Sequence, residues 1–214
     1  MSENFEKYLL LARTARQEGN SEDAKVFYNK LREEDPQNGE AKYFYNFYAL
    51  YEGTNGELPK RFNNLCVAVL SAVKLVKESA LSDEEKLASA EEIIDSFVPE
   101  VWSENRYMNH KNHETKVGDK YVTVFDFNAI TSTSKTGMKT LKELGDSVYD
   151  LFGDSEKGKR LATVAWKEYV ALSQKWYSWA VKGDAEAYTE KIKQIEPTYE
   201  MPKKAGCISL ADKK

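Results

Sequence analysis

Two histidines in a polar stretch are the first residues whose types and spacing suggest chemistry. His110 and His113 are three residues apart, and Glu114 follows directly. Two imidazoles at this spacing can share one metal ion if the segment is helical. A structural zinc site takes four ligands, often including cysteines, and neither cysteine of the chain is close in sequence. A short motif of this kind is a weak signal, so we expect no metal at this position.

A second segment, residues 132–137, reads Ser-Thr-Ser-Lys-Thr-Gly and has the composition of a phosphate-binding loop. It lacks the order G-x-x-x-x-G-K-[ST] that such a loop requires. A turn or helix junction that caps the following helix is the simpler interpretation. Cys66 and Cys207 have no evident catalytic histidine partner, and the common hydrolase and protease motifs do not occur. We therefore expect a protein that is not an enzyme and uses no cofactor.

The composition excludes several classes of partner. Lys and Arg total 31 and Asp and Glu total 35 among 214 residues, giving a net charge of −4. Such a balance offers no bulk positive charge for nucleic acid and no polybasic block for a membrane surface. The most apolar stretch, residues 65–76, is too short to span a bilayer, and the start of the chain has no leader-like pattern. Two isolated cysteines favour a reducing compartment, so we expect a cytoplasmic protein.

The chain reads as a succession of helices that would have to position any site. Helical periodicity and end signals predict helices over about 3–17, 21–34, 38–51 and 59–78. A capping box at residues 82–85 begins a fifth helix, which we expect to continue through Pro99. We expect a loop over 109–120 and a turn over 131–136. Residues 121–125 are β-branched and aromatic, which favours a strand, but no partner strand is apparent, so we expect a helix over 121–130. Further helices follow over about 138–152 and 156–179, and again before Pro197.

Residues 5–38 carry a pattern of small and large apolar positions around a Gly-Asn turn, closed by Asp-Pro. The positions are Tyr8, Leu11, Ala12, Ala15, Gly19, Asn20, Ala24, Tyr28, Leu31 and Pro36. This pattern resembles the 34-residue tetratricopeptide repeat, whose helical hairpins stack to bury a shared core. Residues 39–78 resemble it less closely and residues 166–197 weakly, whereas residues 80–160 resemble no repeat. As a whole the chain is similar to tetratricopeptide-like proteins of bacteria, a resemblance that implies no activity.

The resemblance implies an all-α protein of antiparallel helical hairpins. We expect a tetratricopeptide-like solenoid over residues 1–79, an irregular C-terminal helical bundle over 80–197 with a weak last hairpin, and a C-terminal tail over 198–214. Stacked hairpins of this kind mainly supply binding surfaces.

In the repeat family, the first helix of each hairpin lines a groove that holds an extended peptide. Carried over by position, the peptide-binding residues are Arg13, Arg16, Gln17, Tyr43, Asn46, Phe47 and Tyr51. The arginines would bind carboxylates of a partner by bidentate contacts, and the aromatics would supply rigid contact area. In the alternative interpretation, the arginines are solvated and the aromatics belong to the core. The many aromatics of residues 43–51 likewise fit either a helix covered on two sides or a surface for a partner, and we favour the covered helix.

These observations predict a non-catalytic scaffold that binds a peptide or protein segment in an α-helical groove. One alternative is a structural homo-oligomerisation module, in which aromatic helices form the seam between copies. A less favoured alternative is a metal-dependent enzyme seated near His110 and His113. We expect a protein or peptide partner and neither nucleic acid nor a membrane.

Overall fold

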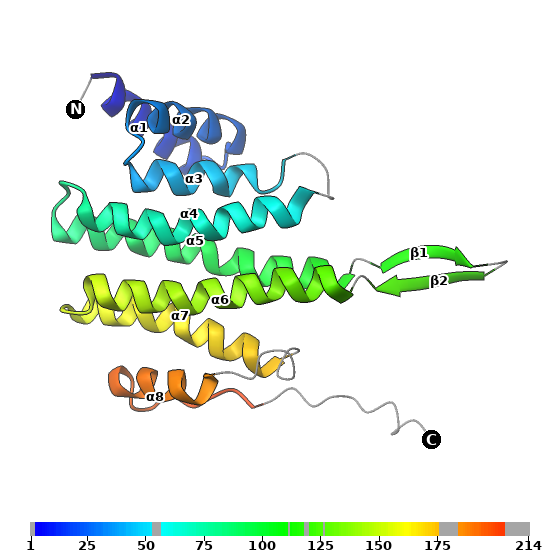
Figure 1. The fold of residues 1–214 in the computed structure, drawn as a ribbon. Coiled ribbons are helices and arrows are strands. Elements are labelled where there is room, and N and C mark those ends of the chain that lie inside the picture. Colours follow the sequence, from blue (N-terminus) through cyan, green and yellow to red (C-terminus); the bar gives the residue numbers. More distant parts are fainter. Residues whose placement is uncertain are drawn as a thin grey trace.

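A computed structural model describes residues 3–52, 57–110, 112–117, 120–125, 127–175 and 184–203. Within these residues the fold is predominantly helical, as expected, with one added β-hairpin (Figure 1). The elements are α1 (Glu3–Gln17), α2 (Ser21–Glu34), α3 (Gly39–Ala49), α4 (Leu58–Glu78), α5 (Asp83–His110), β1 (Asn112–Val117), β2 (Lys120–Phe125), α6 (Phe127–Phe152), α7 (Glu156–Lys175) and α8 (Ala185–Ile195).

Side-chain caps fix where several of these helices begin. Asn20 accepts a hydrogen bond from the backbone N–H of Asp23 at 3.2 Å, and Asn38 accepts one from Ala41 at 2.8 Å. Ser82 and Glu85 form the predicted capping box, in which each side chain accepts a hydrogen bond from the backbone N–H of the other. These bonds satisfy donors that the first turn of a helix leaves open. The polar residues between the helices therefore divide the chain as the sequence predicts.

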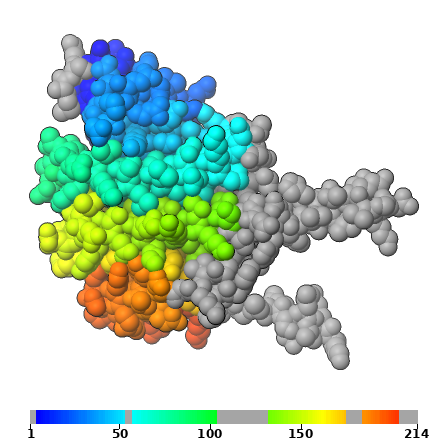
Figure 2. Space-filling view, in the orientation of Figure 1, coloured from blue at the N-terminus to red at the C-terminus, as the bar shows by residue number. Residues whose placement is uncertain are grey.

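The helices stack in chain order from α1 to α8. Each of α1 to α4 packs on the next helix, α4 also contacts α6, and α6 packs on α7, which packs on α8 (Figure 1). Contacts also join alternate helices, since α3 contacts α5 and α5 contacts α7. The space-filling view shows these layers as successive bands (Figure 2). The order of contacts brings α3, α5 and α7 onto one side of the stack.

One hydrophobic core runs through the whole stack. It includes Ala12 of α1, Val69 of α4, Ile93 of α5 and Ile192 of α8, and all four side chains are fully buried. The core is continuous across residue 79, where we expected one domain to end. In the described part of the chain, no helix is both long and apolar enough to span a bilayer.

The end of the described chain also packs on the core. Tyr199 and Met201 are partly buried against it, in a segment that we expected to be a tail. Lys167 lies over the Tyr199 ring, 5.6 Å from its centroid. Residues 204–214 of the expected tail lie outside the described residues.

Three expectations for the middle of the chain are wrong. Residues 112–117, expected in a loop, and residues 121–125, expected in a helix, form an antiparallel hairpin with His113 opposite Val124 and Thr115 opposite Val122. The predicted turn over 131–136 lies inside α6. The strand has a partner because the polar segment before it supplies the backbone hydrogen bonds that a strand requires. Within the Ser/Thr-rich stretch, the Thr136 hydroxyl donates to the carbonyl of Ser132 one turn earlier, at 3.0 Å, so this hydroxyl is hydrogen-bonded without interrupting the helix. The predicted helix through Pro99 is confirmed as the continuous α5.

Candidate functional site

The seven predicted binding residues lie on α1, on α3 and in the turn after α3. Arg13, Arg16 and Gln17 are on α1, and Tyr43, Asn46 and Phe47 are on α3. Tyr51 is in the turn after α3, two residues beyond Ala49. Three of the seven residues contact α5: Arg16, Tyr43 and Tyr51.

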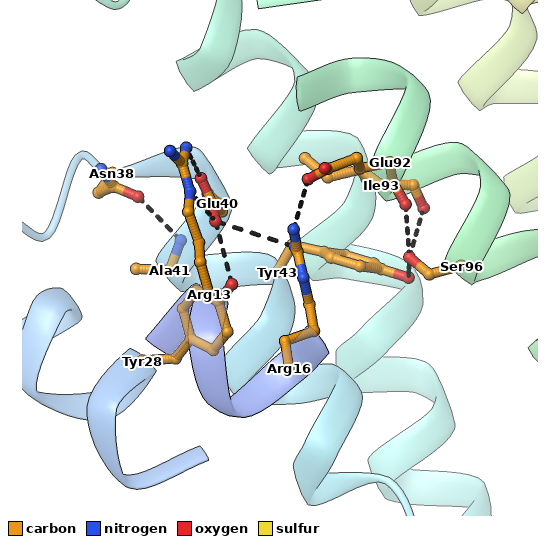
Figure 3. Close-up of polar contacts among 10 residues, drawn as sticks. All are labelled: Arg13, Arg16, Tyr28, Asn38, Glu40, Ala41, Tyr43, Glu92, Ile93 and Ser96. Atoms are coloured by element: carbon orange, nitrogen blue, oxygen red, sulfur yellow. Dashed lines mark hydrogen bonds and ion pairs between the residues drawn. The ribbon is translucent and has the colours of Figure 1, made fainter. Parts of the chain in front are cut away.

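A buried carboxylate, Glu40 of α3, is the centre of the polar contacts (Figure 3). It is 7% exposed and accepts hydrogen bonds from Arg13, with Nε–Oε1 at 3.0 Å and Nη2–Oε2 at 2.6 Å. The hydroxyl of Tyr28 donates to the same Oε1 at 3.0 Å. Glu40 lies in the first turn of α3, where the helix dipole favours a negative charge. The bidentate bonds to Glu40 raise the pKa of the Arg13 guanidinium. Arg13 therefore ties α1 to α3, and its side chain stays 43% exposed.

Arg16 connects the same network to α5. Its Nη2 donates to Oε2 of Glu92 at 2.7 Å, and its Nη1 lies 3.8 Å from Oε1 of Glu40. The guanidinium also lies over the ring of Phe44, with Cζ 4.3 Å from the centroid. A planar guanidinium suits this combination of ion pairing and ring stacking. Most of Arg16 is used within the protein, so it offers a partner less than Arg13 does.

Tyr43 belongs to the core. Its side chain is fully buried, and its hydroxyl is hydrogen-bonded to Oγ of Ser96 on α5 at 3.0 Å (Figure 3). Burial raises the pKa of the Tyr43 phenol far above its ordinary value of 10.0. In this conformation Tyr43 has no surface for a partner, because α5 packs over this side of α3.

The remaining aromatics of α3 are covered on several sides. Phe44 is buried, whereas Tyr45, Phe47 and Tyr48 are half-buried. The rings of Phe44 and Phe47 meet edge to face at 6.0 Å, a favoured geometry for aromatic pairs. Helix α3 contacts α2, α4 and α5, in agreement with the covered helix that we favoured.

The residues with the most open surface are Gln17 and Tyr51. Gln17 is exposed at the end of α1, and Tyr51 is 59% exposed after α3. The Tyr51 hydroxyl donates to Glu100 of α5, and burial raises the pKa of that carboxyl above its ordinary value of 4.5. Asn46 is half-buried, and its amide donates to the backbone carbonyl of Lys42 at 2.8 Å.

Sequence reasoning missed three residues that organise this region: Glu40, Glu92 and Ser96. In the sequence, Glu40 resembles any acidic residue in a first turn, and Glu92 and Ser96 resemble the solvated face of α5. Their partners are 27, 76 and 53 residues away in sequence. No local pattern indicates contacts at that separation.

The other candidate chemistry can be placed only in part. The side chains of His110 and His113 lie outside the described residues, as does Cys207. Thr133 and Ser134 are buried within α6, and Cys66 is buried in α4. Among the described side chains, no group of three or more His, Cys, Asp and Glu is placed to hold a metal ion.

Comparisons of the chain with protein-family models, with curated proteins and with solved structures found no match.

Proposed function

We propose that this protein is a non-catalytic interaction scaffold of stacked helical hairpins, of the tetratricopeptide type. It holds an extended peptide or protein segment on the face where α1, α3 and α5 meet. We call this the α1–α3–α5 face and define it by Arg13, Gln17, Asn46, Phe47 and Tyr51. The proposal places the protein in the cytoplasm, with a protein or peptide as its partner.

The observation that carries the proposal is the set of polar contacts joining these three helices. Arg13 joins α1 to α3 through Glu40, Arg16 joins α1 to α5 through Glu92, and Tyr51 joins the end of α3 to α5 through Glu100. First helices of successive hairpins lie side by side in the repeat family, and α1, α3 and α5 would take that place here. A face held in this way is preorganised, so a ligand loses less binding energy to side-chain ordering.

The chemistry of the face suits a segment with both apolar and polar groups. Phe47 and Tyr51 offer rigid aromatic area, which contributes strongly at interfaces. Arg13 offers the exposed part of its guanidinium, and Gln17 offers an amide. Glu92 and Glu100 add negative charge from α5. We therefore expect a partner segment with an apolar anchor flanked by charged residues of both signs, not a uniformly acidic one.

A peptide selection tests the proposal without a known partner. A random peptide library is selected on the folded protein, and the affinities of the recovered peptides are measured by calorimetry. The Phe47→Ala and Tyr51→Ala variants should each weaken binding at least about fivefold, since truncating an aromatic anchor removes more than about 1 kcal/mol of binding free energy.

Matched controls lie outside the face. Phe27 on α2 is a half-buried phenylalanine that stacks on Tyr8, and Val67 on α4 is an exposed apolar residue. The Phe27→Ala and Val67→Ala variants should bind as the wild type does. Equal affinities for the Phe47, Tyr51 and control variants, all shown to be folded by circular dichroism, would remove the proposed face.

A further inference from the structure

A pocket lies at the other end of the stack, between α6, α7 and α8. It is a pocket of about 430 Å³, a volume in the range that small ligands occupy. The residues that matter for its chemistry are Asp146, Tyr149 and Asp150 of α6, Trp166 of α7, and Lys191 and Ile195 of α8. It shares no residue with the α1–α3–α5 face.

The aromatic wall of the pocket is rigid. Trp166 is only 2% exposed, and a Cβ atom at Gly145 would lie closer than 3.0 Å to its indole ring, so the ring rests directly on the backbone of α6. The Tyr149 ring lies 5.4 Å from the Trp166 ring and is 41% exposed. In the described structure the indole Nε1 of Trp166 is buried without a hydrogen-bond partner. The pocket therefore presents an open tyrosine face beside a tryptophan that is fixed in place.

The ammonium group of Lys191 already lies against the aromatic rings of the pocket. The Lys191 ammonium is 2.9 Å from Oδ1 of Asp146 and lies over two rings, 4.4 Å from the Tyr188 centroid and 5.2 Å from that of Trp166. The Tyr188 hydroxyl donates to the other oxygen of Asp146. Aromatic faces and a carboxylate together attract cations. The position of Lys191 indicates that the site favours a positively charged nitrogen.

Asp150, the second carboxylate of the pocket, has no lysine paired with it among the described residues, in contrast to Asp146. Asp150 is exposed, and the described residues supply it with neither a hydrogen bond nor an ion pair. The pocket thus has two carboxylates and one ammonium among its lining residues, a net charge of −1. Asp150 is also adjacent in sequence to Tyr149, whose ring is open to solvent.

We propose that this pocket binds a cationic nitrogen carried on an alkyl stem, a guanidinium or an ammonium. The cation pairs with Asp150 and lies against the Tyr149 ring, and the stem packs on Ile195. Lys191 stays on Asp146 and weakens binding by repulsion between like charges. The same chemistry is present in an Arg or Lys side chain of a peptide and in a free alkylamine, so both sources are tested.

The experiment follows the Trp166 indole N–H resonance of the full chain by NMR, assigned with the Trp166→Phe variant. The probes are butylguanidinium chloride and butylammonium chloride, with butyramide as the neutral control, all at matched ionic strength. We expect saturable shifts with both cations, at dissociation constants in the millimolar range for ligands of this size. No saturable shift, or equal binding of butyramide, would overturn the proposal.

Charge variants separate the two carboxylates and the resident lysine. Asp150→Asn should weaken cation binding up to about fivefold, as for an exposed ion pair, and Asp154→Asn outside the pocket should leave it unchanged. Lys191→Met should tighten binding by a similar factor, whereas Lys193→Met on the same helix should not. Equal constants for Asp150→Asn and Asp154→Asn would contradict the assigned contact.

The peptide arm uses acetyl-Gly-Arg-Gly-amide and acetyl-Gly-Lys-Gly-amide. Tighter binding of either peptide than of the free alkyl cation identifies a side chain of a partner as the ligand, and the reverse order identifies a free amine. This arm is independent of the α1–α3–α5 face, because Phe47→Ala should leave the cation affinity unchanged. Either proposal can fail while the other stands.

Discussion

Replacing Glu40 should be among the most destabilising single changes in the N-terminal half of the protein. Its carboxylate is buried and accepts hydrogen bonds from two other helices, through Arg13 of α1 and Tyr28 of α2. Removing it leaves the Tyr28 hydroxyl, on a fully buried side chain, without its acceptor. It also leaves the guanidinium of Arg13, and that of Arg16 at 3.8 Å, without the opposite charge.

The expected cost follows from these contacts. A buried donor left without a partner costs about 1–3 kcal/mol. Breaking a buried ion pair costs about 3–5 kcal/mol, but Arg13 is 43% exposed and water can replace much of that contact. We therefore expect Glu40→Ala to lower the free energy of unfolding by about 3 kcal/mol. Glu40→Gln keeps an acceptor for Tyr28 and loses mainly the charge, so about 1–2 kcal/mol is expected.

Urea unfolding followed by circular dichroism measures both costs. Glu33→Ala on α2 is the matched control, because Glu33 is exposed and contacts only Asn29 among the described hydrogen bonds, so its cost should stay within about 0.5 kcal/mol. A double-mutant cycle with Tyr28→Phe should give a coupling energy of about 1 kcal/mol. A cost for Glu40→Ala no larger than for the control would refute the assignment of Glu40 as the centre of the network.

Three further changes test other contacts. Gly145→Ala should lower the free energy of unfolding by about 1–3 kcal/mol, because the new Cβ would overlap the Trp166 indole, and a double mutant with Trp166→Leu should cost less than the sum of the single changes. Glu100→Gln should remove a pH dependence of stability. Because burial raises the pKa of Glu100 in the folded protein, protonated Glu100 contributes its full stabilisation below about pH 4.5. This stabilisation is lost as the pH rises through the pKa of Glu100 in the folded state. The difference between the urea midpoints at acidic and at neutral pH should therefore be smaller in Glu100→Gln than in the wild type. An equal difference in the two proteins would contradict the burial of Glu100. Asn38→Ala should cost about 1 kcal/mol by loss of the α3 cap, while Asn38→Asp should cost little, as denaturation midpoints will show.

Local signals predicted the helices better than they predicted the site. Asn20, Asn38 and Ser82 act through bonds to residues three positions on, so their roles are visible in a short window of sequence. Pro59 likewise lies in the first turn of α4, where proline is favoured. The β-hairpin was missed because Asn112–Val117 is polar and has no strand-like pattern of its own. Only its pairing with Lys120–Phe125 makes it a strand.

The site depends on contacts between distant segments, which the sequence does not reveal. The sequence alone allows Tyr43 at the surface, and only its contact with Ser96 of α5, 53 residues away, shows that this side of α3 is covered. The Trp166 wall depends on Gly145, whose role is visible only when α6 and α7 are packed together. In both cases one helix face can be assigned from periodicity, but which helix covers it follows from the tertiary arrangement.

Mapping a bound peptide onto the protein by NMR tests whether the α1–α3–α5 face is the binding surface. Amide chemical shifts of the full chain are recorded during titration with a peptide from the library selection. We expect the changes to fall on α1, α3 and α5, with the largest at Phe47 and Tyr51. Changes confined to the outer sides of α2 and α4, or to the pocket between α6, α7 and α8, would contradict this expectation.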